Sequence, residues 1–254
     1  MKGLMVLVAG LLAAGCASVP SGQPDPRDPW ELSNRWAFGV NDALARAVLR
    51  PTARAYVKVM PRIVRTGVSN VFANLETVTT LVNDALQGKM SAVGHDSARL
   101  LLNTTLGLGG LLDPASAAGI DRNDEDFGQT LGVWGLQSGP YLMLPFLGPS
   151  TVRDTVGRVP DHFTDPTHYL EDDSTRYAIT AVEIIHLRAG LLDYDDDLAQ
   201  SFDRYAFVRN VWMQRREYKV KDGNVEEPAF DEDEMLDEEE MLNEEPAPKP
   251  AGEP

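Results

Sequence analysis

Residues 103–154 read NTTLGLGGLLDPASAAGIDRNDEDFGQTLGVWGLQSGPYLMLPFLGPSTVRD, and this stretch decides what kind of fold the chain can have. Glycine or proline interrupts it every few residues, yet leucine, phenylalanine, tryptophan and tyrosine fill the intervals. A loop is normally polar, because its backbone N–H and C=O groups need water or another partner. The prolines also prevent one long helix. We therefore expect this stretch to pack on helices or to contact lipid.

Amphipathic helical patterns flank this stretch on both sides. Apolar residues recur there at the helical spacing of three to four. The expected helices cover about 28–50, 52–59, 64–87, 91–102, 173–192 and 197–218. Gly88 is expected to end the third helix in a left-handed conformation. Side chains suited to begin a helix stand at Asp28, at Thr151 with Asp154, at Asp172 and at Asp197.

Strand signals are few. The sequence shows no sustained alternation of apolar and polar residues and no Asn-Gly hairpin, so the predicted class is mostly α. After residue 16 no run approaches 18 consecutive apolar residues, which is the length that a membrane-spanning helix needs. Contact with a membrane would then come from amphipathic helices lying in the interface or from the apolar loops.

The N-terminus has the pattern of a bacterial lipoprotein. Residues 1–15 combine a basic Lys2 with a short apolar run, which predicts a signal peptide. Cys16 follows Ala-Ala-Gly, a sequence that resembles a lipobox, and it is the only cysteine in the chain. Cys16 is therefore the predicted lipidation site, and residues 16–27 are a predicted flexible tether. The alternative is an ordinary secretory signal with an unrelated cysteine.

Charge separates the C-terminal end from the rest of the chain. The formal net charge is -16, and residues 222–254 hold 14 Asp and Glu against one Lys. The preceding residues therefore carry only -3. We expect one domain over 28–220 and an acidic, disordered tail over 221–254. Nucleic acid is excluded as a partner, because phosphate binding requires a basic surface.

No motif for catalysis or for a metal is present. The G-x-S-x-G nucleophile elbow of lipases is absent. His162 and His168 fit no zinc spacing, and the acidic run from Asp193 lacks the Gly and Glu of a calcium loop. The sequence predicts no catalytic residue, no metal and no cofactor. A lipid hydrolase is accordingly the least favoured class.

Six segments in order resemble the VacJ/MlaA family of outer-membrane lipoproteins, and the resemblance covers about 28–218. They are DPWELSNRWAFGVNDAL (28–44), VRTGVSNVFANL (64–75), VNDALQGK (82–89), NTTLGLGGLLDP (103–114), DEDFGQTLGVWG (124–135) and GPYLMLPFLGPSTVRD (139–154). The chain departs from the family at Leu32-Ser33 and Gly39-Val40, where aromatic residues are usual, at Ala13 in the lipobox and in its long acidic tail.

The resemblance implies a single ring-shaped helical domain, embedded in the outer membrane, with a central amphipathic channel. Such a protein is anchored at the periplasmic leaflet and takes mislocalised phospholipid from the outer leaflet. It passes this lipid to a soluble periplasmic carrier and associates with a trimeric porin. The family is not enzymatic. The alternative function is a porin-associated structural envelope lipoprotein without transport activity.

Two sets of residues are the candidates for contact with lipid. The expected channel or membrane contacts are Leu106, Gly107, Gly109, Gly110, Leu111, Tyr141, Leu142, Met143, Phe146 and Leu147. Core packing is the alternative for each of them. The expected phosphate contacts are Arg99, Arg122 and Arg153, with pairing to Asp96, Asp126 or Asp154 as their alternative.

Overall fold

The computed structural model describes residues 25–224, and this part of the chain is mostly helical. The predicted signal peptide, Cys16 and most of the predicted tether and acidic tail lie outside the described residues. No helix within 25–224 is both long and apolar enough to cross a membrane. The predicted mostly α class is therefore confirmed.

The chain builds a succession of helices with one β-hairpin inserted in the last third. The first half contains α2 (Glu31–Leu44), the π-helical turn η1 (Ala45–Leu49), α3 (Arg50–Val59), α4 (Arg62–Gln87), α5 (Met90–Thr105) and α6 (Pro114–Ala117). The second half contains α7 (Phe127–Val133), β1 (Tyr141–Leu144), β2 (Gly148–Thr151), α8 (Val152–Thr164), η2 (Pro166–Tyr169), α9 (Asp173–Gly190), η3 (Leu192–Tyr194), α10 (Asp195–Gln200) and α11 (Arg204–Val220).

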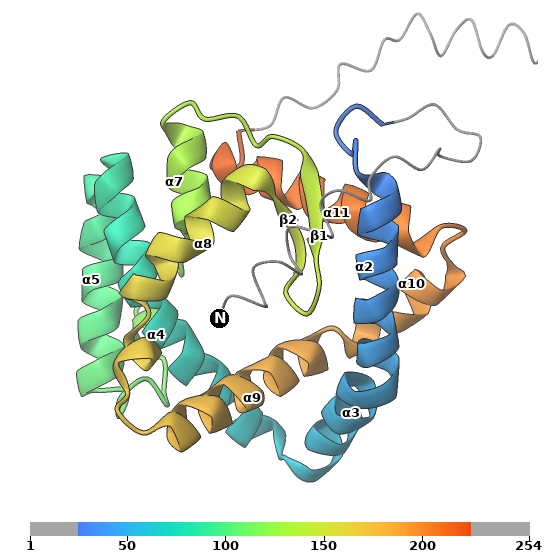
Figure 1. The fold of residues 1–254 in the computed structure, drawn as a ribbon. Helices are drawn as coiled ribbons and strands as arrows, with labels where there is room; N and C mark the ends of the chain where they lie inside the picture. The colour runs from blue at the N-terminus through green and yellow to red at the C-terminus, as the bar shows by residue number, and fades with distance from the viewer. Residues whose placement is uncertain (1–24, 225–254) are drawn as a thin grey trace, which may run out of the picture.

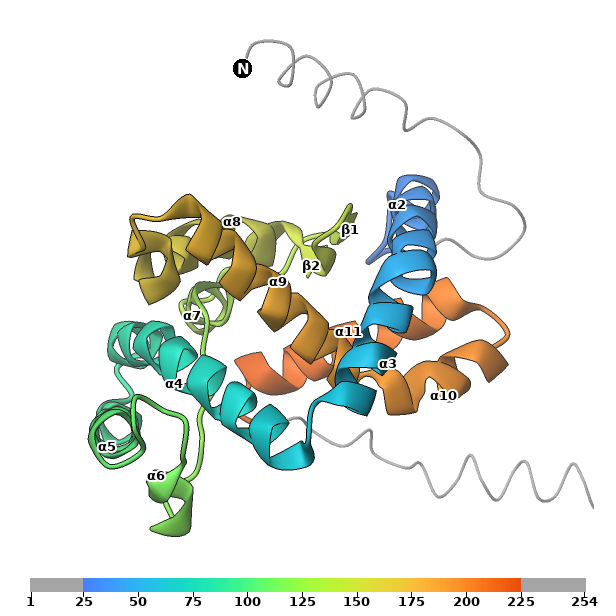
Figure 2. The same ribbon diagram turned by 90° about the horizontal axis from the view of Figure 1, so that it is seen from below.

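These elements are arranged as a ring. In Figure 1, α2 and α3 form one side, and α4 forms the opposite side with α5 packed outside it. The third side is α9, and α8 with the hairpin closes the fourth (Figure 1). Seen after a quarter turn in Figure 2, α10 and α11 lie at a different level from α8 and the hairpin. The helices are thus arranged in a ring and not around one central core.

Several predicted helix ends are confirmed. Gly88 ends α4 with φ of 75°, in the left-handed region that glycine adopts without strain. Thr151 begins α8, because its hydroxyl accepts a hydrogen bond from the Asp154 backbone N–H at 3.2 Å. Asp172 likewise accepts from the Thr175 N–H at 2.8 Å and begins α9.

Two predicted caps are wrong. Asp28 does not cap α2, which begins at Glu31; its side chain is buried and accepts from Arg209 Nη1 at 2.9 Å. A long-range ion pair has therefore replaced the expected local bond. Asp197 lies inside α10, and the last helix begins at Arg204, with Asp203 as the cap.

The hairpin was not expected from the sequence. β1 and β2 pair antiparallel, with Tyr141 opposite Thr151. Its position is set by two asparagines on α2. Asn34 donates to the Tyr141 carbonyl at 3.0 Å and accepts from the Met143 N–H at 2.9 Å. Asn41, two turns later, accepts from the N–H of residue 146 at 2.7 Å, so α2 holds both the strand and its turn.

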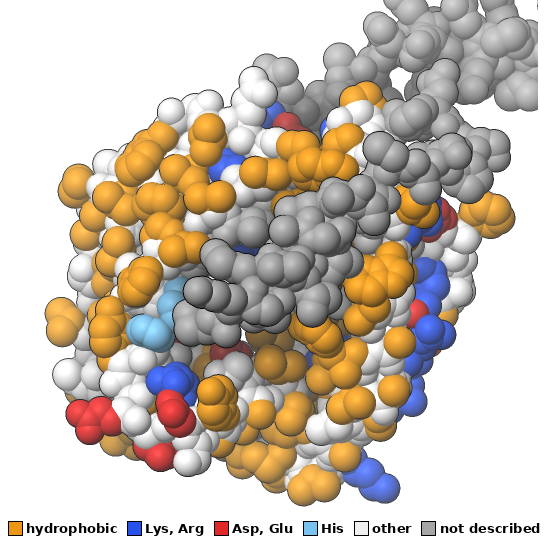
Figure 3. Space-filling view, in the orientation of Figure 1, with side chains coloured by type: hydrophobic (Ala, Val, Ile, Leu, Met, Phe, Trp, Pro, Cys, Tyr) orange, Lys and Arg blue, Asp and Glu red, His pale blue; other side chains and the backbone are white. Residues whose placement is uncertain are grey.

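The burial of side chains is inverted relative to an ordinary soluble domain. Among residues 25–224, eighteen polar or charged residues are buried but only six apolar ones. Four of those six form a small cluster: Ala37, Tyr141, Met143 and Tyr205. Large apolar side chains are instead exposed, including Trp36, Ile63 and Leu101. Figure 3 shows such side chains around the rim of the ring, so this surface requires an apolar environment.

Candidate functional site

The large cavity, of about 740 Å³, is the first part of the candidate site. Side chains of α4, α8 and α9 line it, together with the segment before α7, the start of η2 and Leu147 in the hairpin turn. These elements surround the opening of the ring in Figure 1. Its apolar lining consists of Phe72, Leu75, Leu147, Val159 and Phe163. The rest of the lining consists of seven carboxylates, three threonines, Arg158 and His162, so the cavity is amphipathic and rich in acidic side chains.

The small cavity, of about 370 Å³, adjoins the large one. The two share Asp126, Arg158 and Asp161 in their linings. The small cavity contains no aliphatic side chain and is lined by Asp126, Ser150, Asp154, Arg158, Asp161, Trp212, Arg215, Arg216 and Lys219. The candidate site therefore changes from a partly apolar lining with seven carboxylates to a lining in which four cations stand beside three carboxylates, and the two linings meet at the three shared residues.

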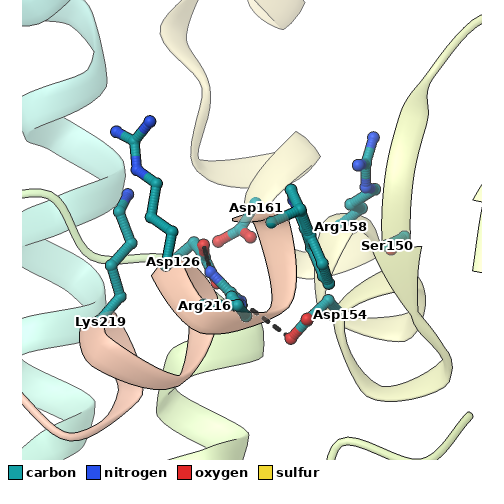
Figure 4. A pocket seen from close by; sticks show the side chains of 9 residues that line it. Asp126, Ser150, Asp154, Arg158, Asp161, Arg216 and Lys219 are labelled. Atoms are coloured by element: carbon teal, nitrogen blue, oxygen red, sulfur yellow. Dashed lines mark hydrogen bonds and ion pairs between the residues drawn. The ribbon is translucent and has the colours of Figure 1, made fainter. Parts of the chain in front are cut away.

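Arg216 of α11 organises the wall of the small cavity, as Figure 4 shows. Its guanidinium donates to both carboxylate oxygens of Asp126, at 2.5 and 2.6 Å, and to Asp154 at 2.9 Å. Burial alone would raise the pKa of Asp126, but the hydrogen bond and charge of Arg216 hold it below its ordinary value. Since Asp126 caps α7 and Asp154 lies in the first turn of α8, one guanidinium connects three helices.

Arg158 differs from Arg216 in having no carboxylate partner within the described part of the chain. Its single hydrogen bond is a long one, from Nη2 to the Pro149 carbonyl at 3.4 Å. Two hydrogen bonds fix the carboxylate of the neighbouring Asp161. It accepts from the Phe127 N–H at 3.0 Å and from the Asn83 amide at 3.1 Å. Burial raises the pKa of Asp161 to about 6. Arg158 is thus a cation free to meet an anion from the cavity.

The segment 139–149 divides between the core and the candidate site. Tyr141 and Met143 belong to the small apolar cluster, so for these two side chains the structure corresponds to core packing. Leu142 is half-buried. Phe146 is 74% exposed, and Leu147 lines the large cavity. Along β1 every second side chain is buried, because successive side chains of a strand point to opposite faces. The residues of the segment 139–149 therefore do not form a single surface.

The glycine-rich loop 106–112 lies away from both cavities. It is a tight hydrogen-bonded turn, in which the N–H of Gly110 donates to the Asn103 carbonyl at 2.8 Å. A Cβ on Gly107 would stand 2.3 Å from that same carbonyl oxygen, so close packing requires glycine there. Leu106 and Leu111 are exposed, while Gly109 has φ of 73°. Contact of this loop with lipid stays a prediction.

The three arginines expected to meet phosphate all have acidic partners. Arg99 is buried, and its partner is Asp113 at 3.0 Å, not Asp96. Arg122 pairs with Glu76 on the surface. Arg153 is buried and pairs with its neighbour Asp154, 3.1 Å away. The cation that lines both cavities is instead Arg158, which no motif in the sequence distinguishes.

The histidines form no recognisable centre. The rings of His162 and His168 lie 3.9 Å apart between centroids, and His186 interacts with the Tyr56 hydroxyl at 3.2 Å. Within residues 25–224, no three His, Cys, Asp or Glu side chains are placed to hold a metal ion.

A buried acid beside the site makes folding depend on pH. Asp84 of α4 is fully buried, and burial, together with a hydrogen bond to Asp96 of α5, raises its pKa to about 7. Between about pH 4 and pH 7, Asp84 is ionised in the unfolded chain but still protonated in the folded protein. The free energy of unfolding therefore falls as pH rises through this range. We expect Asp84→Asn to stabilise the fold by about 2 kcal/mol more at pH 8 than at pH 5.

Thermal unfolding in uncharged detergent micelles at both pH values measures this effect. Asp121→Asn removes one charge from an exposed position near the same helices and serves as the control. Its melting temperature should follow that of the unaltered protein. The interpretation is wrong if the gain from Asp84→Asn is equal at pH 5 and pH 8.

Comparisons with known proteins agree on one group. A family model described as MlaA lipoprotein matches residues 26–219. The intermembrane phospholipid transport system lipoprotein MlaA of Escherichia coli strain K12 is 37% identical over 84% of this chain and 86% of its own length. An uncharacterized protein of Rickettsia felis is 33% identical over 76% and 78% respectively.

The fold also matches a solved structure. This structure was reported as the structural basis for maintenance of bacterial outer membrane lipid asymmetry, and it aligns with a TM-score of 0.69 at 38% identity. The alignment covers 76% of this chain and 98% of the other. At this identity the likeness extends to the sequence as well as to the arrangement of the helices.

Proposed function

The chain belongs to the MlaA lipoprotein family, and we propose that it transports phospholipid between the membranes of a Gram-negative envelope. In this proposal it takes mislocalised phospholipid from the outer leaflet of the outer membrane, so that lipid asymmetry is maintained. The lipid passes through the opening of the ring along the two cavities and reaches a soluble periplasmic carrier. The lipid leaves chemically unchanged.

The inverted burial of side chains carries this proposal. A domain whose outward side chains are apolar while its interior is polar suits a lipid surrounding and a hydrated lumen. Moving a lipid with about 30 CH₂ groups through water would cost on the order of 25 kcal/mol, so its chains must stay covered. The apolar residues that line the large cavity, here called the apolar strip, offer such cover; they are Phe72, Leu75, Leu147, Val159 and Phe163. The polar lining of the same cavity offers a path for the headgroup.

The same proposal assigns a location and partners. Acyl chains on Cys16 would hold the protein at the periplasmic leaflet of the outer membrane, since two or more chains are needed for stable anchoring. The ring would lie in the membrane through its exposed apolar side chains, without a spanning helix. Association with a trimeric porin belongs to this proposal too.

The test is the phospholipid content of the outer leaflet in cells that lack this protein, measured by a reagent that modifies only exposed lipid. We expect the content to rise on deletion, to return to normal with the wild-type chain, and to stay high with Cys16→Ala. No change on deletion would refute transport. It would favour a structural lipoprotein that holds porin without moving lipid.

A further inference from the structure

Two of the cationic side chains that line the small cavity have no paired carboxylate in the described part of the chain. Four cationic side chains line it against three carboxylates. Two of the cations are paired, because Arg216 bonds Asp126 and Asp154, and Lys219 bonds Asp124 at 2.5 Å. Arg158 and Arg215 have no carboxylate partner within residues 25–224. With Asp124 counted, cations and carboxylates balance, so the two unpaired guanidiniums, and not a net charge, favour an anion here.

The position of Arg158 limits the kind of anion. It lines both cavities, at the place where the charged lining meets the apolar strip. Val159, the next residue, belongs to that strip, as does Leu147 in the hairpin turn. A ligand that fills both cavities would have an anionic head and an apolar chain. A small inorganic anion would leave the apolar strip in contact with water.

We propose that Arg158 binds the phosphate of a phospholipid headgroup in the small cavity, with an acyl chain in the large cavity. A guanidinium presents five N–H donors, and Arg158 uses only one, in a long bond to Pro149. The remaining donors suit the oxygens of a phosphodiester. Arg215 supplies a second positive charge to the same cavity. This assignment deepens the proposed function and rests on it.

Binding of short-chain lipids to the purified full chain in uncharged detergent micelles tests the assignment by titration calorimetry. Dihexanoylphosphatidylglycerol is the probe, dihexanoylglycerol lacks the phosphate, and inorganic phosphate lacks the chains. We expect Arg158→Gln to weaken binding of the phospholipid about tenfold or more, and Arg158→Lys to weaken it less. Binding of dihexanoylglycerol should be weak and equal in all variants.

Arg54→Gln is the matched control, since Arg54 is exposed on α3, lines neither cavity and has no ion pair within the described residues. It should bind the phospholipid as the wild type does. Equal affinity of Arg158→Gln and wild type overturns the assignment. Inorganic phosphate binding as tightly as the phospholipid also overturns it, in favour of a site for free phosphate.

The outer-leaflet measurement on the same variants separates this inference from the proposed function. If Arg158→Gln binds phospholipid normally and restores the outer leaflet, the headgroup site is wrong and transport stands. If deletion of the whole chain leaves the outer leaflet unchanged, transport itself is wrong. Weakened binding together with incomplete restoration supports both.

Discussion

Replacement of Arg216 by methionine is expected to lower the free energy of unfolding by about 3–5 kcal/mol, the range for removing one partner of a buried ion pair. The side chain of Arg216 is only 11% exposed, and that of Asp154 is 7% exposed. Methionine fills much of the same volume but leaves Asp126 without a paired cation and Asp154 with Arg153 as its one remaining cation. Because those carboxylates belong to the first turns of α7 and α8, both helices should loosen from α11.

Thermal and denaturant unfolding in micelles measures this loss. The control is Arg122→Met, which breaks the pair with Glu76, where both side chains are about half exposed. Pairs of that kind contribute roughly 0–1 kcal/mol, so the control should change stability little. Equal losses in the two variants would show that Arg216 does not organise the three helices.

A double variant distinguishes loss of the ion pair from loss of packing. Asp126→Asn removes the uncompensated charge when it is added to Arg216→Met, whereas Asp154 keeps its pair with Arg153. We expect a substantial part of the lost stability to return, because the large penalty comes from leaving a buried charge unpaired. If the double variant is less stable than Arg216→Met alone, the Asp126 carboxylate acts mainly as the cap of α7, and its amide does not replace it.

The helices could be predicted because their signals are local. The apolar spacing along α4 and the glycine after it predict the position of nearly the whole helix. Gly88 has the expected left-handed conformation. Thr151 and Asp172 cap their helices through residues only three positions away. Asp28 shows the limit of such reasoning. It has the right side chain for a cap, yet Arg209, 181 residues later, pairs with it instead.

The hairpin and the candidate site depend on distant residues. Strands of four residues are too short for a clear alternation, and the partners of β1 include Asn34, more than a hundred positions earlier. Burial of Tyr141 follows from packing on Tyr205, which no local pattern indicates. Arg158 is notable only because no acid pairs with it in the described fold. The absence of a partner is a property of the fold and not of the sequence.

Tryptophan at position 159 is expected to block transport while leaving the fold intact. Val159 lines the large cavity and is 59% exposed, so an indole there has room to extend into the cavity without disturbing a packed core. Surface substitutions of this kind usually change stability by no more than about 0.5 kcal/mol. An indole beside Arg158 would cover the junction through which chain and headgroup must both pass.

Val156→Trp is the matched control, because Val156 lies on the same helix, is 58% exposed and lines neither cavity. In cells lacking the native protein, the control should restore the outer leaflet, whereas Val159→Trp should leave exposed phospholipid near the level of the deletion. Both variants should melt at similar temperatures and remain in the membrane fraction. Full restoration by Val159→Trp would mean that lipid does not pass the large cavity, and the opening of the ring would need another explanation.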